Sequence, residues 1–113
     1  MDINPELSEK IQELQIIERN LQGFAMEKQS FQVELNEITN ALTELSKSGD
    51  EVYKILGGLM IKSEKNSLSK DLNDKKKILE LRISSVEKQE KSIEEKSDKL
   101  RKEINAKMIV KAK

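Results

Sequence analysis

An apolar segment near the middle of this 113-residue chain is interrupted by two adjacent glycines. It reads Val52-Tyr53-Lys54-Ile55-Leu56-Gly57-Gly58-Leu59-Met60-Ile61-Lys62. β-Branched and aromatic residues favour strands, and a Gly-Gly pair supplies the positive φ angles that a two-residue hairpin turn requires. The segment therefore predicts a β-hairpin over about residues 51–62.

Long helices are predicted on both sides of this hairpin. Only one glycine, Gly23, lies between Pro5 and Ser46, and none follows Asn66. Asn4 followed by Pro5 is typical of a helix start, and Ser48-Gly49-Asp50 is typical of a helix end. We expect a first helix over about 5–46 and a second over about 65–111, capped by Ser63 or Asn66. Residues 1–113 then form a single domain.

Both helices carry apolar residues at seven-residue spacing, which predicts a coiled coil. The first series is Leu7, Leu14, Leu21, Lys28, Leu35 and Leu42, with Ile17, Phe24, Phe31, Ile38 and Leu45 as its companion. In the second helix the series is Leu72, Leu79, Val86, Ile93 and Leu100, whose companion (Lys76, Ile83, Glu90, Ser97 and Ile104) is mostly polar. A hairpin between the helices makes them antiparallel. If residue 57 is the midpoint, facing residues sum to 114, and Leu14 then meets Leu100.

This register leaves one polar break in the first seam. Lys28 would face Val86, covering it with the alkyl stem while the ammonium reaches water. The fold class expected is therefore mostly α with a small β element: a long antiparallel two-helix coiled coil joined by one β-hairpin.

The hairpin is too apolar to stand alone. An isolated two-stranded hairpin is marginally stable, and its unpaired edges invite pairing with other chains. Closing several hairpins into a barrel would remove those edges and bury the apolar side chains. We therefore expect oligomerisation into a β-barrel body through Val52, Tyr53, Ile55, Leu56, Leu59 and Ile61. The simpler alternative is a loop folded back on the helices.

Apolar residues also gather near both chain ends, beyond what one seam can bury. Ile109 and Val110 fall off the seam, and Ile17 faces the polar Ser97 in the register above. We therefore expect apolar side chains to be exposed at the free end of the coiled coil. The alternative is ordinary packing of a fraying coiled-coil end.

Composition excludes several classes of function. The chain has no Cys and no His, so the usual nucleophile–base pairs and soft-metal sites have no candidates. We expect no enzyme activity, no metal and no cofactor. No apolar run approaches the ~20 residues needed to span a bilayer, and residues 1–5 lack the features of a signal peptide. These observations predict a cytoplasmic protein without a membrane partner.

Charge is distributed unevenly along the chain. Residues 1–56 carry 5 Lys/Arg and 11 Asp/Glu, a net charge of −6, whereas residues 57–113 carry 16 and 10, a net charge of +6. A basic half can bind nucleic acid. Here acidic residues are interleaved with the lysines and would repel phosphates, and the basic half has no aromatic residue to stack on bases. We expect the two halves to attract each other, and no nucleic-acid partner.

The helix–hairpin–helix order resembles the β-type subunit of the prefoldin family. The similar stretches are the hairpin at 52–62, Leu79-Glu80-Leu81-Arg82-Ile83 after it and Val33-Glu34-Leu35-Asn36-Glu37-Ile38 before it. A single hairpin points to the β type, since α-type subunits carry two. The resemblance implies an archaeal-type hexamer of two α and four β subunits. Such a hexamer captures non-native proteins at its coiled-coil tips and passes them to a group II chaperonin without ATP.

Carried over by position, the resemblance implies a client-binding set at the tip: Leu7, Ile11, Leu14, Ile104, Met108 and Ile109. The alternative from another class is a structural coiled-coil protein that binds one specific helical partner. The hairpin distinguishes the two, because a plain coiled coil has no use for the apolar residues around Gly57-Gly58.

Overall fold

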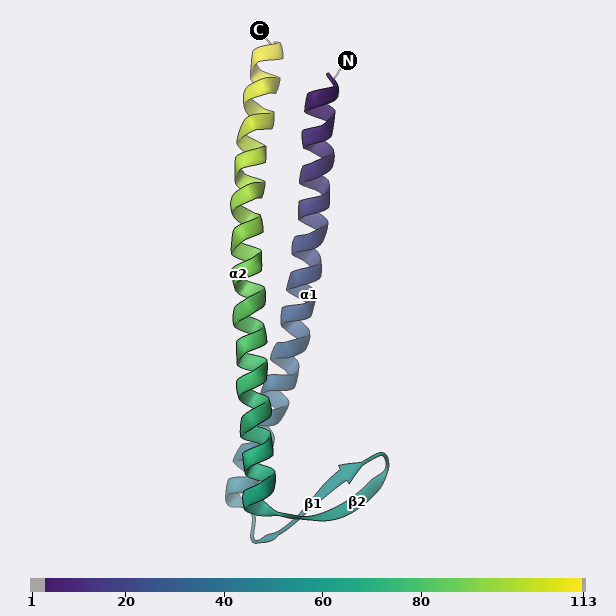
Figure 1. The fold of residues 1–113 in the computed structure, drawn as a ribbon, viewed down its shortest axis with the longest axis vertical. Helices are drawn as coiled ribbons and strands as arrows, with labels where there is room; N and C mark the ends of the chain where they lie inside the picture. Colours follow the sequence, from purple (N-terminus) through teal and green to yellow (C-terminus); the bar gives the residue numbers. More distant parts are fainter. Residues whose placement is uncertain (1–3, 113) are drawn as a thin grey trace. The chain divides into compact units, whose positions relative to one another are not determined.

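The computed structural model describes residues 4–112, in the order helix, hairpin, helix (Figure 1). Helix α1 spans Pro5–Lys47 and helix α2 spans Lys65–Ala112. Strands β1 (Glu51–Leu56) and β2 (Leu59–Glu64) lie between them and pair antiparallel. The expected fold class is confirmed: two long helices joined by one antiparallel hairpin.

The chain divides into two compact units. We call residues 1–28 with 85–113 the terminal unit, and residues 29–84, which include the hairpin, the hairpin unit. Within each unit a segment of α1 runs antiparallel to a segment of α2 (Figure 1).

The ends of α1 are fixed by local hydrogen bonds. The Asn4 Oδ1 atom accepts from the Leu7 backbone N–H at 2.7 Å, which confirms Asn4 as the N-cap. At the other end, the Ser48 hydroxyl donates to the Leu45 carbonyl at 2.8 Å. The Lys65 ammonium donates to the Ser48 carbonyl at 2.8 Å. The residue that follows α1 is therefore linked to the first residue of α2.

Burial follows the predicted heptads in both units. None of the seam positions is exposed, whether the residue is apolar or polar. The most deeply buried in the terminal unit are Leu7, Ile17, Val86, Ser97, Leu100 and Ile104, and in the hairpin unit Leu45, Leu79 and Ile83. Ser97 is only 4% exposed and Ile17 only 8%. The inference that Ile17 is left uncovered by Ser97 is therefore wrong, and the polar companion series of α2 is part of the seam.

The turn forms as predicted, but the second strand is longer than expected. Gly57 (φ 54°) and Gly58 (φ 82°) both have positive φ, and they join the facing pair Leu56 and Leu59. Strand β2 continues to Glu64, and α2 begins at the next residue. Ser63 therefore lies in the strand, opposite Val52, and does not cap α2. Asn66 lies inside the helix and does not cap it either.

Candidate functional site: the exposed hairpin and the paired chain ends

The hairpin presents its apolar side chains to solvent. Ile55, Met60 and Leu59 are 73%, 69% and 68% exposed, and Leu56, Tyr53 and Ile61 are also largely exposed. Val52 is the exception, since it is buried. Of the predicted oligomerisation residues, the structure therefore leaves Tyr53, Ile55, Leu56, Leu59 and Ile61 uncovered, whereas Val52 is already covered by its own chain.

Alternation along the strands distributes these residues over two faces of the hairpin. Pairing Ile55 with Met60 puts them on one face, and pairing Leu56 with Leu59 puts them on the other. Each face carries one lysine, Lys62 opposite Tyr53 and Lys54 opposite Ile61. The half of the hairpin next to the turn is thus apolar on both sides, a feature that an isolated hairpin cannot bury.

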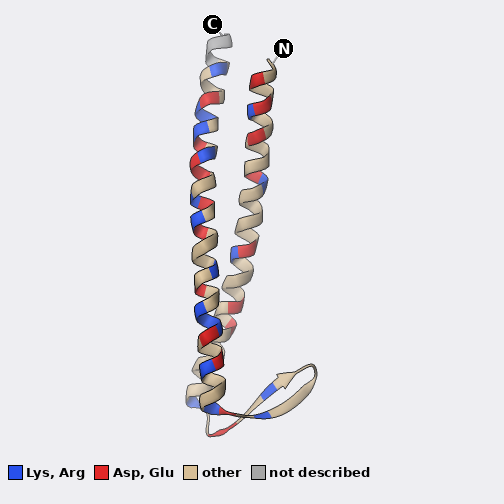
Figure 2. Cartoon of the chain, in the orientation of Figure 1, with Lys and Arg blue, Asp and Glu red and all other residues tan. Residues whose placement is uncertain are grey.

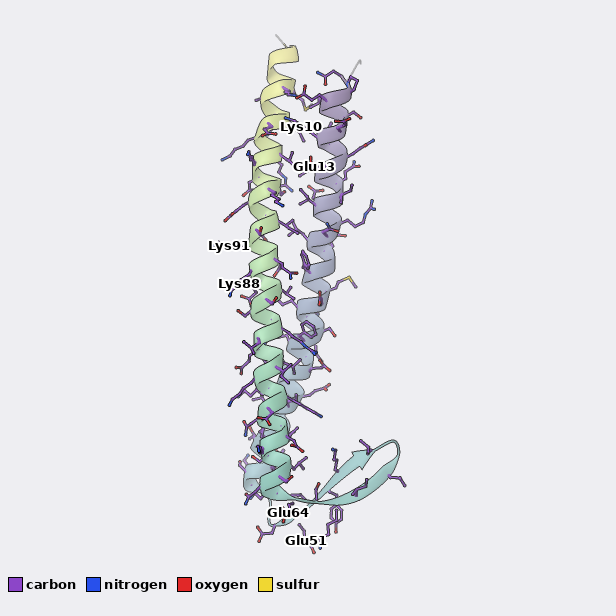
Figure 3. The ribbon with its side chains drawn as sticks, in the orientation of Figure 1. Lys10, Glu13, Glu51, Glu64, Lys88 and Lys91 are labelled. Atoms are coloured by element: carbon purple, nitrogen blue, oxygen red, sulfur yellow. The ribbon has the colours of Figure 1, made fainter. Side chains whose placement is uncertain are left out.

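The base of the hairpin is acidic. Glu51 faces Glu64 across the first pair of the ladder (Figure 3), and like charges directly opposite each other destabilise a strand pair. Over the described residues, no three Asp or Glu side chains come together in a way that could hold a metal ion.

The predicted client-binding residues differ in accessibility. Leu7 and Ile104 are buried, at 3% and 7% exposure, because they pack in the interhelical seam of the terminal unit. Ile11 and Leu14 are half-buried, while Met108 is 51% exposed. The side chain of Ile109 lies outside the described residues. The chain ends are therefore apolar, but most of that surface faces the opposite helix.

Ion pairs flank this seam and join α1 to α2. Glu6 binds Lys107 at 2.6 Å, Lys10 binds Glu103 at 2.9 Å and Glu18 binds Arg101 at 2.8 Å. Lys10 lies on α1 with its side chain toward α2 (Figure 3). Exposed pairs of this kind contribute little to stability individually, but each of these joins residues more than 80 positions apart and so helps to fix the antiparallel register.

These contacts shift the pKa values of the groups involved. A hydrogen bond from Lys107, helped by its charge, lowers the pKa of Glu6. A hydrogen bond from Lys10 likewise lowers the pKa of Glu103, and the same bond raises the pKa of Lys10. Each of these shifts favours the charged form of the side chain.

The polar break at Lys28 is filled by another ion pair. The Lys28 ammonium, which we expected to reach water, binds Glu90 at 2.8 Å, and this hydrogen bond raises the pKa of Lys28. Both residues occupy seam positions, one on each helix. The two polar interruptions of the seam thus satisfy each other, and a matched polar pair of this kind favours one register.

The basic half of the chain does not form a continuous positive surface. Figure 2 shows Lys/Arg and Asp/Glu alternating along α2, as the interleaved acids predict. Neither helix, over the part of the chain that the structure describes, has a stretch apolar enough to cross a membrane. The surfaces that stand out are therefore the hairpin and the paired chain ends.

Sequence reasoning did not find the interhelical ion pairs or a set of exposed apolar residues on the outer helix faces. The latter are Ile16, Met26, Val33, Ile78 and Leu81. Each falls outside the heptad seam, so the same periodicity that located the seam could have placed them on the surface. The ion pairs carry no such signal, because any Lys or Glu flanking the seam can reach several partners.

Together these features define a class of protein: a two-helix coiled coil carrying an exposed apolar β-hairpin. Residues 8–109 match the family model described as prefoldin subunit. The chain belongs to the prefoldin subunit family, whose members are in general chaperone subunits that assemble with other prefoldin subunits.

Relatives of known sequence and structure agree with this assignment and with the β type. The chain is 38% identical to prefoldin subunit beta of Sulfurisphaera tokodaii over 105 residues, covering 91% of this chain and 84% of the relative. It is 32% identical to prefoldin subunit beta of Pyrobaculum islandicum, over the same shares of each chain. The crystal structure of the prefoldin beta subunit from Thermococcus strain KS-1 matches with a TM-score of 0.86 at 33% identity, covering 93% of this chain and 94% of the other.

Proposed function

We propose that this chain is a subunit of an ATP-independent holdase. It assembles through its hairpin, captures non-native proteins at the apolar ends of its coiled coil and passes them to a group II chaperonin. The observation that carries the proposal is the exposed apolar hairpin, because a cluster of apolar side chains left uncovered in a single chain is typical of an interaction surface. Family membership supports the chaperone role.

The proposed assembly contains two α-type and four β-type subunits and works in the cytoplasm. Each hairpin supplies its exposed Tyr53, Ile55, Leu56, Leu59 and Ile61 to a shared barrel. Closure of a barrel removes the free strand edges. The coiled coils then present several chain ends to one client.

The proposed client surface consists of Leu7, Ile11, Leu14, Ile104, Met108 and Ile109. A fully buried Leu or Ile side chain contributes ~1.5–3 kcal/mol, so one end with a few partial contacts binds weakly. Several ends acting on the same client raise the avidity ~10²–10⁴-fold without new contacts. Binding of this kind is firm but reversible without a nucleotide.

The test is suppression of aggregation by the assembled protein. The full-length chain, co-assembled with an α-type subunit, should suppress light scattering by a denaturant-unfolded protein after dilution. Deleting residues 1–8 and 104–113 should abolish suppression while the assembly keeps its size apart from the missing residues. A truncated assembly that still suppresses aggregation would overturn the proposed client surface.

Salt separates apolar capture from capture by charge. Apolar burial is not screened by salt, whereas exposed charge pairs are largely screened at physiological ionic strength. Suppression should therefore weaken little between low and physiological salt. A collapse over that range would point instead to the lysines of α2.

A further inference from the structure

The proposed client surface is partly hidden by its own chain. Leu7 and Ile104 are 3% and 7% exposed, and Ile17 and Leu100 of the same seam are also buried. A client cannot reach these side chains while α1 and α2 are in contact. Among the members of the proposed set whose side chains the structure describes, Met108 is the one that is more than half exposed.

Four charged residues surround the buried pair of Leu7 and Ile104. Glu6 and Lys10 are one turn apart on α1 and precede and follow Leu7, while Glu103 and Lys107 do the same for Ile104 on α2. Glu6 binds Lys107 and Lys10 binds Glu103. The signs alternate around all four residues, which we call the terminal charge network.

We propose that α1 and α2 separate at their free ends when a client binds, and that the client takes the place of the opposite helix on Leu7 and Ile104. The terminal charge network then sets how often the ends open. This inference rests on the proposed function and adds how access of clients to the binding residues is regulated. Helix ends are the least stable parts of a fold and open locally. The apparent affinity of a site that is accessible only part of the time falls in proportion to its open fraction.

The network opposes opening, and an apolar client segment does not replace it. When the ends separate, the client can restore the apolar contacts of Leu7 and Ile104, but it brings no Lys or Glu in the positions of the lost partners. The four charges therefore stabilise the form in which α1 and α2 are in contact, and they do not stabilise the open form that binds the client. Weakening the network should strengthen capture, the opposite of what is expected if clients bind the closed ends.

The decisive experiment locks the ends together. Because the sequence has no Cys, Lys10→Cys/Glu103→Cys introduces thiols that a short cleavable dithiol-reactive crosslinker can join within one chain. The matched control is Lys28→Cys/Glu90→Cys, which replaces the other interhelical ion pair at 2.8 Å, away from the free ends of the helices. The readout is the dissociation constant of the co-assembled protein for dye-labelled β-casein, an unstructured probe without cysteine.

Crosslinking residues 10 and 103 should weaken binding of β-casein at least fivefold, and cleaving the crosslinker should restore it. The control crosslink should leave binding unchanged. Equal binding before and after crosslinking at 10 and 103 would overturn the inference while leaving the proposed function intact. Absence of binding by the unmodified assembly would instead overturn the proposed function, and the inference with it.

A second variant tests the network without any crosslink. Glu6→Gln/Lys10→Gln removes one partner of each ion pair and keeps the net charge at zero. It should tighten β-casein binding roughly two- to fivefold, the range expected for exposed ion pairs, and speed hydrogen exchange of the last turns of α2. Lys28→Gln serves as the control and should do neither. Weaker binding by the double variant would contradict the inference.

Discussion

Replacing Ile55 and Ile61 with aspartate should dissociate the assembly and leave the helices intact. The two residues lie on opposite faces of the hairpin, because Ile55 pairs with Met60 and Ile61 pairs with Lys54 one position further along. The double variant therefore disrupts the hairpin interface whichever face points into a barrel. Helices α1 and α2 do not include either position.

The expected loss follows from how much of each side chain is uncovered. Ile55 is 73% exposed and Ile61 is 45% exposed. With ~1.5–3 kcal/mol for a fully buried Ile, burial of the two in an interface contributes about 2–3.5 kcal/mol. Losing that much raises a dissociation constant roughly 30- to 300-fold. A carboxylate placed in an apolar interface adds a further desolvation cost.

The assay is native mass spectrometry with far-ultraviolet circular dichroism on the same samples. The double variant should lose the oligomer and keep its helix content. Val33→Asp is the matched control, since Val33 is an apolar residue 52% exposed on α1, and it should keep the full oligomer. A double variant that retains the wild-type mass would refute assembly through the hairpin.

Three further predictions concern the coiled coil. Spin labels at Gln15 and Lys99, whose numbers sum to 114, should lie close within one chain, and a long distance in the folded protein would rule out the antiparallel register. Leu79→Ala should lower the free energy of unfolding, measured by chemical denaturation, by about 2–5 kcal/mol, because Leu79 is 5% exposed. The control Leu81→Ala, at 71% exposure, should change it by no more than about 0.5 kcal/mol. Equal losses for the two variants would contradict the assignment of Leu79 to the interhelical seam. The pKa of Glu103 is lowered from its ordinary 4.5, so its stabilising effect is present above that value and is lost as the pH falls through the lower, folded-state pKa. Thermal unfolding should therefore show that Glu103→Gln loses less stability between pH 6 and pH 3 than the wild type does, and identical losses would show that this pair is not formed in solution.

The parts of the fold that could be predicted depend on backbone chemistry and periodicity. Gly57 and Gly58 adopt positive φ, which few other residues allow, and Asn4 caps α1 through a short side chain with one obvious partner. The heptads place Leu79 and Leu100 in the seam because the helical repeat leaves no other face for them. These features are local, so the sequence contains what is needed to find them.

What could not be predicted depends on three-dimensional choices among similar residues. Lys28 could have reached water or any of several acids, and it binds Glu90. Burial of Val52 and extension of β2 to Glu64 depend on how the hairpin joins the helices. At the chain ends, composition predicted an apolar surface, but it could not show that Leu7 and Ile104 are buried.

Site-specific photo-crosslinking during client capture tests the central claim most directly. A photoreactive residue is placed at Met108, near the chain ends, or at Leu81 in the hairpin unit, both of which are exposed apolar positions on α2. With denaturant-unfolded client and the co-assembled protein, the account predicts covalent adducts from position 108 and few from position 81. Adducts that form equally at both positions, or mainly at position 81, would contradict capture at the ends of the coiled coil.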